Sequence, residues 1–236
     1  MKKSLWLKVS IFATGISGLI AEFILSTLAS YFIGDSIVQW TIVLSIMLFS
    51  MGVGSRLSRF ITKNLLLTFI LIEFALSLFI SFSPLAVYAI AGQTAYIHLL
   101  IYGLAFIVGL LIGFELPLAT RLNETHEELD KNISNILSWD YTGSLIGGLL
   151  FAFWGLPHLG ITNTAFVFGI LNFIVALLLF WQYSDKSFLK QKGMLLVGIF
   201  LAATLGLGFY FSEEIVLFGE QSRYKDKIIF QKQSRY

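Results

Sequence analysis

The sequence predicts an all-α integral membrane protein, in which a bundle of about seven transmembrane helices precedes a short C-terminal β-hairpin-like tail. Two observations carry this prediction. Of the 236 residues, 57% are hydrophobic and 13% are charged, whereas an average soluble domain has about 45–50% apolar and about 25% charged residues. The apolar residues also form continuous runs of the length that crosses a bilayer as a helix, about 20 residues.

Seven apolar runs are the predicted transmembrane helices. Strands of a membrane barrel would alternate polar and apolar residues over segments of about 10 residues. These runs are instead continuous and rich in Leu, Ile and Phe, so we expect helices. In order, they cover residues 5–33, 37–55, 64–83, 95–118, 135–156, 161–182 and 193–212. Lys2 and Lys3 precede the first run, which is too long for a signal peptide, so we expect it to be retained as a helix.

The basic residues of the connections alternate along the chain and predict its orientation. Eleven of the 16 basic residues fall at the N-terminus or in every second connection, and the other connections between the runs hold none. By the positive-inside rule, the N-terminus is cytoplasmic in a bacterial inner membrane. Seven spans then place the tail after Ser212 outside, although it holds the other five basic residues. The alternative is a miscounted span within residues 64–112.

Composition also excludes several classes of protein. The chain has no cysteine and a formal net charge of +2. The absence of cysteine excludes disulfides, thiolate metal sites and cysteine catalysis, and the small net charge does not indicate a nucleic-acid partner. No hydrolase, zinc-protease or nucleotide-loop motif occurs. We therefore assign no catalytic residue and no metal ligand from the sequence.

Four acidic residues fall inside the predicted spans. A charged residue at the centre of a spanning helix costs about 2.5–3.5 kcal/mol on insertion scales, so such groups are expected to face the bundle interior and to have partners. The four are Glu22 in the first run, Glu73 in the third, Glu115 near the cytoplasmic end of the fourth, and Asp140 early in the fifth.

Two interpretations of these acids are open. They form a cation or polyamine site between helices, or they are carboxyls that only fix helix packing. Glu22 and Glu73 have no evident basic partner in the sequence, so neither interpretation is preferred for them. For Glu115 and Asp140 we favour packing, because three arginines at the same cytoplasmic level can form ion pairs with them: Arg56, Arg59 and Arg121.

Two further features bear on helix packing. Pro117 follows Glu115 by two residues and is expected to break the hydrogen-bond ladder of its helix. Small residues recur at the spacing that lets helices pack closely in lipid. We expect them to act within one subunit; the pairs are Gly109/Gly113 and Gly143/Gly147.

Residues 213–236 differ from the predicted transmembrane helices in their mixture of polar and apolar residues. Val216-Leu217-Phe218 and the mixed stretch after it are expected to form short strands with polar turns, and Gln-Ser-Arg-Tyr occurs at both 221–224 and 233–236. Two strands alone are not stable in water. We therefore divide the chain into a seven-helix transmembrane domain, residues 1–212, and the incomplete start of a β-containing region, residues 213–236.

The tail resembles the N-terminal strands of spermidine synthases, which are polyamine aminopropyltransferases. The matching residues are Tyr224-x-Asp226-x-Ile228 and Gln233-Ser234-Arg235-Tyr236. The helical part resembles the membrane portion of bacterial fused, membrane-bound spermidine synthases. Its matching pieces are Gly18-x-x-x-Glu22, Met51-Gly52-x-Gly54-Ser55, Gly113-x-Glu115-x-Pro117, Asp140-Tyr141-x-Gly143-x-x-x-Gly147, Leu156-Pro157-x-x-Gly160 and Leu171-Asn172.

The role that this resemblance implies depends on which parts of the family's proteins the chain contains. In this family, aminopropyl transfer from decarboxylated S-adenosylmethionine to putrescine needs a Rossmann-like domain with a Gly-rich loop and a catalytic Asp, which the chain does not contain. The resemblance thus implies a domain that anchors or regulates an absent catalytic domain, has no cofactor of its own and is inactive alone. The expected partners are the lipid bilayer, polyamines and a second copy of the chain.

Two rival functions remain. One is a small transporter that works as a homodimer and moves its substrate without any other domain. The other is a helical scaffold whose buried acids only hold the helices together. Composition does not separate these functions from the anchor.

Overall fold

The computed structural model describes residues 2–92, 94–124, 128–183, 188–224 and 226–228, which are almost entirely helical. No strand occurs among them. The elements, in order, are α1 (Lys2–Ile33), α2 (Ser36–Leu57), η1 (Ser58–Phe60), α3 (Leu65–Ala89), α4 (Thr94–Asn123), α5 (Leu129–Leu150), η2 (Phe151–Leu159), α6 (Gly160–Tyr183), α7 (Phe188–Tyr210) and α8 (Ser212–Gln221).

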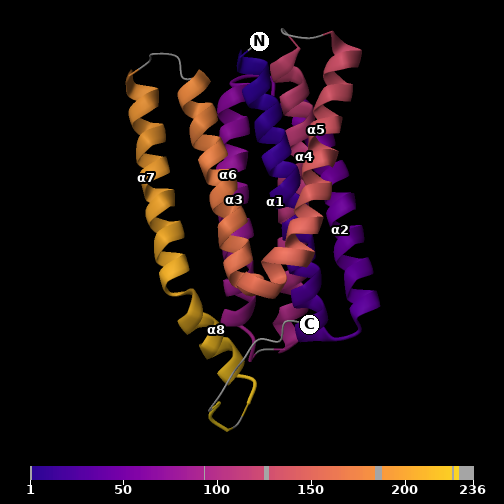
Figure 1. Cartoon of the computed structure of the whole chain (residues 1–236), viewed down its shortest axis with the longest axis vertical. Coiled ribbons are helices and arrows are strands. Elements are labelled where there is room, and N and C mark those ends of the chain that lie inside the picture. Colours follow the sequence, from indigo (N-terminus) through magenta and orange to yellow (C-terminus); the bar gives the residue numbers. More distant parts are fainter. Residues whose placement is uncertain (1, 93, 125–127, 184–187, 225, 229–236) are drawn as a thin grey trace.

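Seven long helices, α1 to α7, stand side by side, and α8 lies at the end of the bundle opposite the start of α1 (Figure 1). Among the described residues, five continuous helical stretches are long and apolar enough to cross a membrane, and one of them, Leu129–Gln182, runs through α5, η2 and α6. Figure 1 shows the chain reversing its direction at η2, so α5 and α6 form separate legs. A sixth stretch results if α7 and α8, bent by 48°, count as one span.

Helix α1 is the centre of the bundle. It packs against α2, α3, α4, α5 and α6, and 72% of its apolar stretch is buried, against 28% for α2. Helix α7 packs mainly against α3 and α6 and stands at the edge of the bundle (Figure 1). Along its length, α1 therefore contacts side chains from five other helices.

Glycines allow these helices to approach one another, as expected within one subunit. A Cβ at Gly143 of α5 would clash with the Phe12 carbonyl of α1, and one at Gly147 would lie 2.5 Å from the Ile16 carbonyl oxygen. On the other side of the bundle, a Cβ at Gly109 of α4 would lie 2.8 Å from the Met47 carbonyl oxygen of α2. Both predicted glycine pairs thus serve intramolecular helix contacts.

Pro117 removes one bond of the hydrogen-bond ladder but does not end α4, which continues through it to Asn123. Proline removes one backbone N–H, and neighbouring groups in a packed bundle can satisfy the carbonyl that it frees. The local turn is also tied by side chains: Thr120 Oγ1 donates to the Leu116 carbonyl at 2.8 Å. The sharp turn of this half of the chain occurs instead between α5 and α6, where Gly160 has φ 75°.

The predicted β-hairpin-like tail is wrong for the described residues, because Val216, Leu217 and Phe218 lie in α8. The inward positions of this segment follow a helical period: Ile215 and Val216 pack against the core, and Gly219 and Glu220 are buried one turn later. A run of three apolar residues is too short to reveal that period. Residues 229–236, with the second Gln-Ser-Arg-Tyr, lie outside the described residues.

Candidate functional site

One turn of α1 contains the small or hydroxyl-bearing residues Thr14, Gly15, Ser17 and Gly18, and other helices press against it from several sides. A Cβ at Gly15 would clash with the Asp140 backbone of α5 and would lie 3.1 Å from Asp140 Oδ1. Ser144 Oγ of the same helix donates to the Gly15 carbonyl at 3.3 Å. On the α4 side, a Cβ at Gly18 would lie 3.2 Å from Ile112. This stretch of α1 therefore brings polar groups from several helices together in the bundle interior.

Glu73 of α3 reaches this turn of α1 at Thr14 and is fully buried, with 0% exposure. Thr14 Oγ1 lies 2.9 Å from Glu73 Oε1 and 2.8 Å from the Ser10 carbonyl oxygen. The Thr14 hydroxyl carries one proton, which it shares between the Glu73 carboxyl and the Ser10 carbonyl. Glu73 Oε2 has no hydrogen-bond partner among the described residues.

Glu115 of α4 is the second fully enclosed carboxyl, with 3% exposure. Its Oε1 is without a hydrogen-bond partner in the described part of the chain. Glu73 and Asp140 lie close enough to Glu115 to interact with it electrostatically. We call Glu73, Glu115 and Asp140 the carboxyl cluster. Three negative charges that are buried close together repel one another. A proton or another cation between the members of the cluster would therefore stabilise it.

Unpaired polar groups continue from the carboxyl cluster between α3 and α6. Ser17 of α1 hydrogen-bonds Asn172 Oδ1 of α6, while Asn172 Nδ2 is buried with no partner among the described residues. The Ser77 and Ser81 hydroxyls of α3 are likewise buried, with no hydrogen-bond partner in the described ranges. Glu73, Ser77 and Ser81 recur every four residues and so share one face of α3. This spacing of polar residues in an apolar run is visible in the sequence and is the signal that predicts such a face.

Glu22 stands apart from the carboxyl cluster. It lies eight residues after Thr14, about 12 Å further along α1, and is partly exposed. It makes no hydrogen bond or ion pair within the described residues. The structure therefore brings three of the four predicted acids together and leaves the fourth at another level.

The three predicted arginine partners do not pair with these acids among the described residues, where the ion pairs are Lys131–Glu128 and Arg223–Glu220. Arg121 binds backbone carbonyls instead: Nη1 donates to Ile61 at 2.8 Å, Nη2 to Ser58 at 2.8 Å, and Nε to Pro117 at 3.2 Å. Arg59 lies over the Phe60 ring at 4.6 Å, and Arg56 is exposed.

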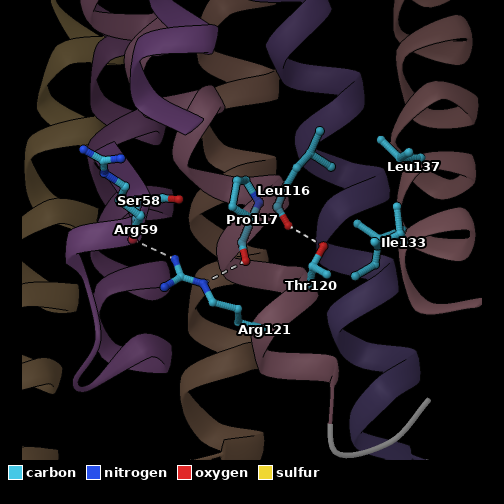
Figure 2. A pocket seen from close by; sticks show the side chains of 9 residues that line it. Ser58, Arg59, Leu116, Pro117, Thr120, Arg121, Ile133 and Leu137 are labelled. Carbon is cyan, nitrogen blue, oxygen red and sulfur yellow. Dashed lines mark hydrogen bonds between the residues drawn. The ribbon is translucent and has the colours of Figure 1, made fainter. Parts of the chain in front are cut away.

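Arg121 also borders a pocket at the α1-start end of the bundle. Figure 2 shows the guanidinium reaching from α4 to η1, with Pro117 and Thr120 beside it and Ile133 across from it on α5. The pocket has a volume of about 580 Å³, and its other walls are mainly apolar. The guanidinium thus fastens η1 to α4, which is a structural role that the sequence did not indicate.

The described residues hold no group of three or more metal-ligating side chains arranged for a metal ion. The fold and the site together define a class of protein. It is a bundle of long apolar helices whose central carboxyls have no basic partner among the described residues.

Relatives of this chain carry a more specific name. A polyamine aminopropyltransferase 2 of Aquifex aeolicus is 43% identical to the whole chain, which covers 47% of that protein. The polyamine aminopropyltransferase of Leptospira interrogans is 35% identical, again over the whole chain and 47% of the relative. That of Oceanobacillus iheyensis is 35% identical over 94% of the chain and 44% of the relative.

The homologues of this chain are thus polyamine aminopropyltransferases, which confirms the resemblance noted in the sequence at that level. The chain spans about half the length of the curated relatives it matches. No protein-family model matches the sequence, and no solved structure matches it.

Proposed function

We propose that this chain is the membrane domain of a polyamine aminopropyltransferase-like protein, which anchors or regulates a catalytic domain. The observation that carries the proposal is the coincidence of two facts. The homology covers the whole chain but about half of each relative, and this half consists of long apolar helices of membrane-spanning length. A region so apolar needs lipid around it, because its outward faces carry large hydrophobic side chains such as Phe153, Leu196 and Phe200.

The orientation that we propose follows from the distribution of basic residues over the two ends. The start of α1, η1 and the end of α4 lie at one end of the bundle, and α8 lies at the other (Figure 1). The first end carries Arg56, Arg59, Lys63 and Arg121, so the positive-inside rule makes it cytoplasmic. In this orientation α8 is on the outer side of a bacterial inner membrane.

Cysteine labelling tests this arrangement on a clean background, because the natural chain has no cysteine. Ser36 and Thr62 are exposed at opposite ends of α2. In intact cells, a membrane-impermeant maleimide should label the Ser36→Cys variant. The Thr62→Cys variant should react only after permeabilisation. The reverse pattern would overturn the orientation, and equal labelling of both variants in intact cells would overturn the membrane span between them.

The finer part of the proposal is that the carboxyl cluster binds a cation, with polyamines as the expected class. Glu73 Oε2 and Glu115 Oε1 support this, because each is a buried acceptor without a hydrogen-bond partner among the described residues. Buried polar groups are normally hydrogen-bonded, so such a concentration marks a place where a ligand, water or proton completes the network. A Glu73→Gln variant should then bind spermidine more weakly by calorimetry than the natural chain, and unchanged affinity would remove this site.

A small homodimeric transporter remains the second candidate, and the same unpaired groups favour it, because intramembrane acids commonly mark ion pathways. It predicts polyamine flux into proteoliposomes that contain this chain alone. Sealed vesicles without flux would leave the anchor role in place.

A further inference from the structure

The end of the bundle at α8 contains a second cavity, separate from the carboxyl cluster. It has a volume of about 590 Å³ and lies between the ends of α1 and α3, the start of α6, and α8. Tyr31 on its wall lies 17 residues after Thr14 on α1, which is about 25 Å at the helical rise. The volume is within the range of about 300–1,000 Å³ that is common for small-molecule sites.

Two carboxylates line this cavity from a single helix. Glu213 and Glu220 are both on α8 and both line the cavity. Seven residues separate them, so they lie two turns apart on one face, with backbone positions about 10 Å apart. Val216 and Leu217 line the cavity between them. The wall thus presents an acid, an apolar stretch and a second acid in line.

Two tyrosines line the same cavity, from α1 and α3. The Tyr31 hydroxyl donates to the Glu220 carboxylate, whose two oxygens are both at 3.0 Å. Tyr88 is 8% exposed, lines the cavity and makes no hydrogen bond from its hydroxyl among the described residues. The Tyr88 side chain is thus largely buried while its hydroxyl is free to form a hydrogen bond with a ligand in the cavity.

This end of the bundle already holds one cation of the chain itself. The Arg223 guanidinium lies 3.5 Å from Glu220 Oε2, 4.7 Å from the centre of the Tyr31 ring and 5.0 Å from that of Phe32. Aromatic faces beside a carboxylate are a favourable environment for organic cations. A carboxylate offers about four lone-pair positions, so Glu220 can accept a further donor from the cavity side, while Glu213 makes no ion pair among the described residues.

We propose that this cavity binds a linear organic cation with at least two ammonium groups on a methylene chain, one held near Glu213 and the other near Glu220. The ammonium groups pair with the carboxylates and with the Tyr88 hydroxyl, and the methylene groups lie on Val216 and Leu217. The charge pattern excludes an anionic ligand. The proposal stands on this cavity alone and not on the proposed role of the central carboxyl cluster.

Calorimetry on the purified full chain in detergent micelles tests the proposal, with spermidine, which carries three ammonium groups, as the multivalent ligand and butylamine as a monovalent control. The natural chain should bind spermidine at least tenfold more tightly than butylamine. Glu213→Gln should weaken spermidine binding about tenfold, because one of the two ammonium groups loses its counter-charge. It should leave butylamine binding within about twofold.

Glu214→Gln is the matched control, because Glu214 is the exposed next residue of α8 and does not line the cavity. It should bind spermidine like the natural chain. Both residues are exposed, so we expect neither variant to change thermal stability. No spermidine binding by the natural chain, or equal losses in both variants, would overturn the proposal.

Glu73→Gln separates this cavity from the central site. Spermidine binding that is kept in Glu73→Gln and weakened in Glu213→Gln supports the cavity at α8. Binding that is weakened in Glu73→Gln and kept in Glu213→Gln overturns the cavity proposal and assigns the amine to the carboxyl cluster.

Discussion

Two buried glutamates of this protein are in contrasting environments. Glu220, at the α8 end, accepts from the Tyr31 hydroxyl and pairs with Arg223. Glu73, in the middle of the bundle, has one hydroxyl contact, with Thr14, and its charged neighbour is another carboxyl, that of Glu115. Glu220 is already held by protein partners that fasten α8 to α1, and a ligand in the cavity would add to them. Glu73 has one oxygen without a partner among the described residues, so it is a candidate for binding or proton transfer by itself.

The contrast depends on the close approach of α5 to α1, because that contact brings Asp140 next to Gly15. A valine at Gly143 would overlap the Phe12 carbonyl, so Gly143→Val should force the helices apart. We expect a loss of at least about 3 kcal/mol in unfolding free energy, measured by denaturation in detergent micelles.

The control for this change is Gly206→Val on α7, where a Cβ would meet nothing within 4 Å. It should leave stability within about 0.5 kcal/mol. Equal losses at both positions would show that α5 does not approach α1 as closely as the contact at Gly143 requires.

A substitution of Arg121 tests which contacts stabilise the end of the bundle where α1 begins. Its guanidinium donates to three carbonyl groups on η1, the following residue and α4, a set that a lysine ammonium cannot reproduce. Arg121→Lys should lower the unfolding free energy by about 2 kcal/mol and make the connection at 58–64 more sensitive to protease. Arg59→Lys, at an exposed residue, should do neither; similar effects of both substitutions would refute the role of Arg121.

A direct comparison of the two glutamates should give the smallest effects. Glu220→Gln removes the counter-charge of Arg223, which is partly exposed, so we expect a loss of about 1 kcal/mol in unfolding free energy. Glu73→Gln removes a charge that has no basic partner, and should leave thermal stability unchanged or raise it slightly. If Glu73→Gln is the more destabilising of the two, the carboxyl cluster is a packing device and the contrast fails.

The errors in the sequence prediction share one cause. The sequence predicts a strand for the short apolar run at 216–218. In the structure this run is part of α8, which packs against the end of α3, with Gly219 against the Tyr88 carbonyl. Arg121 was expected to meet a carboxylate at its own level, but the carbonyls of Ser58 and Ile61 lie nearer to its guanidinium. In both cases the deciding partner is distant in sequence.

The amino-acid sequence alone determined the apolar character of the chain, the number of long helices and the small residues through which they touch. These properties depend on composition and on spacing within one helix, which are local. The tertiary structure decided that Glu73, Glu115 and Asp140 meet at one level of α1 while Glu22 does not. It also decided that α8 closes a cavity against Tyr31 and Tyr88. Such neighbours depend on how the helices are shifted and rotated against one another, and packing across the whole bundle sets those parameters.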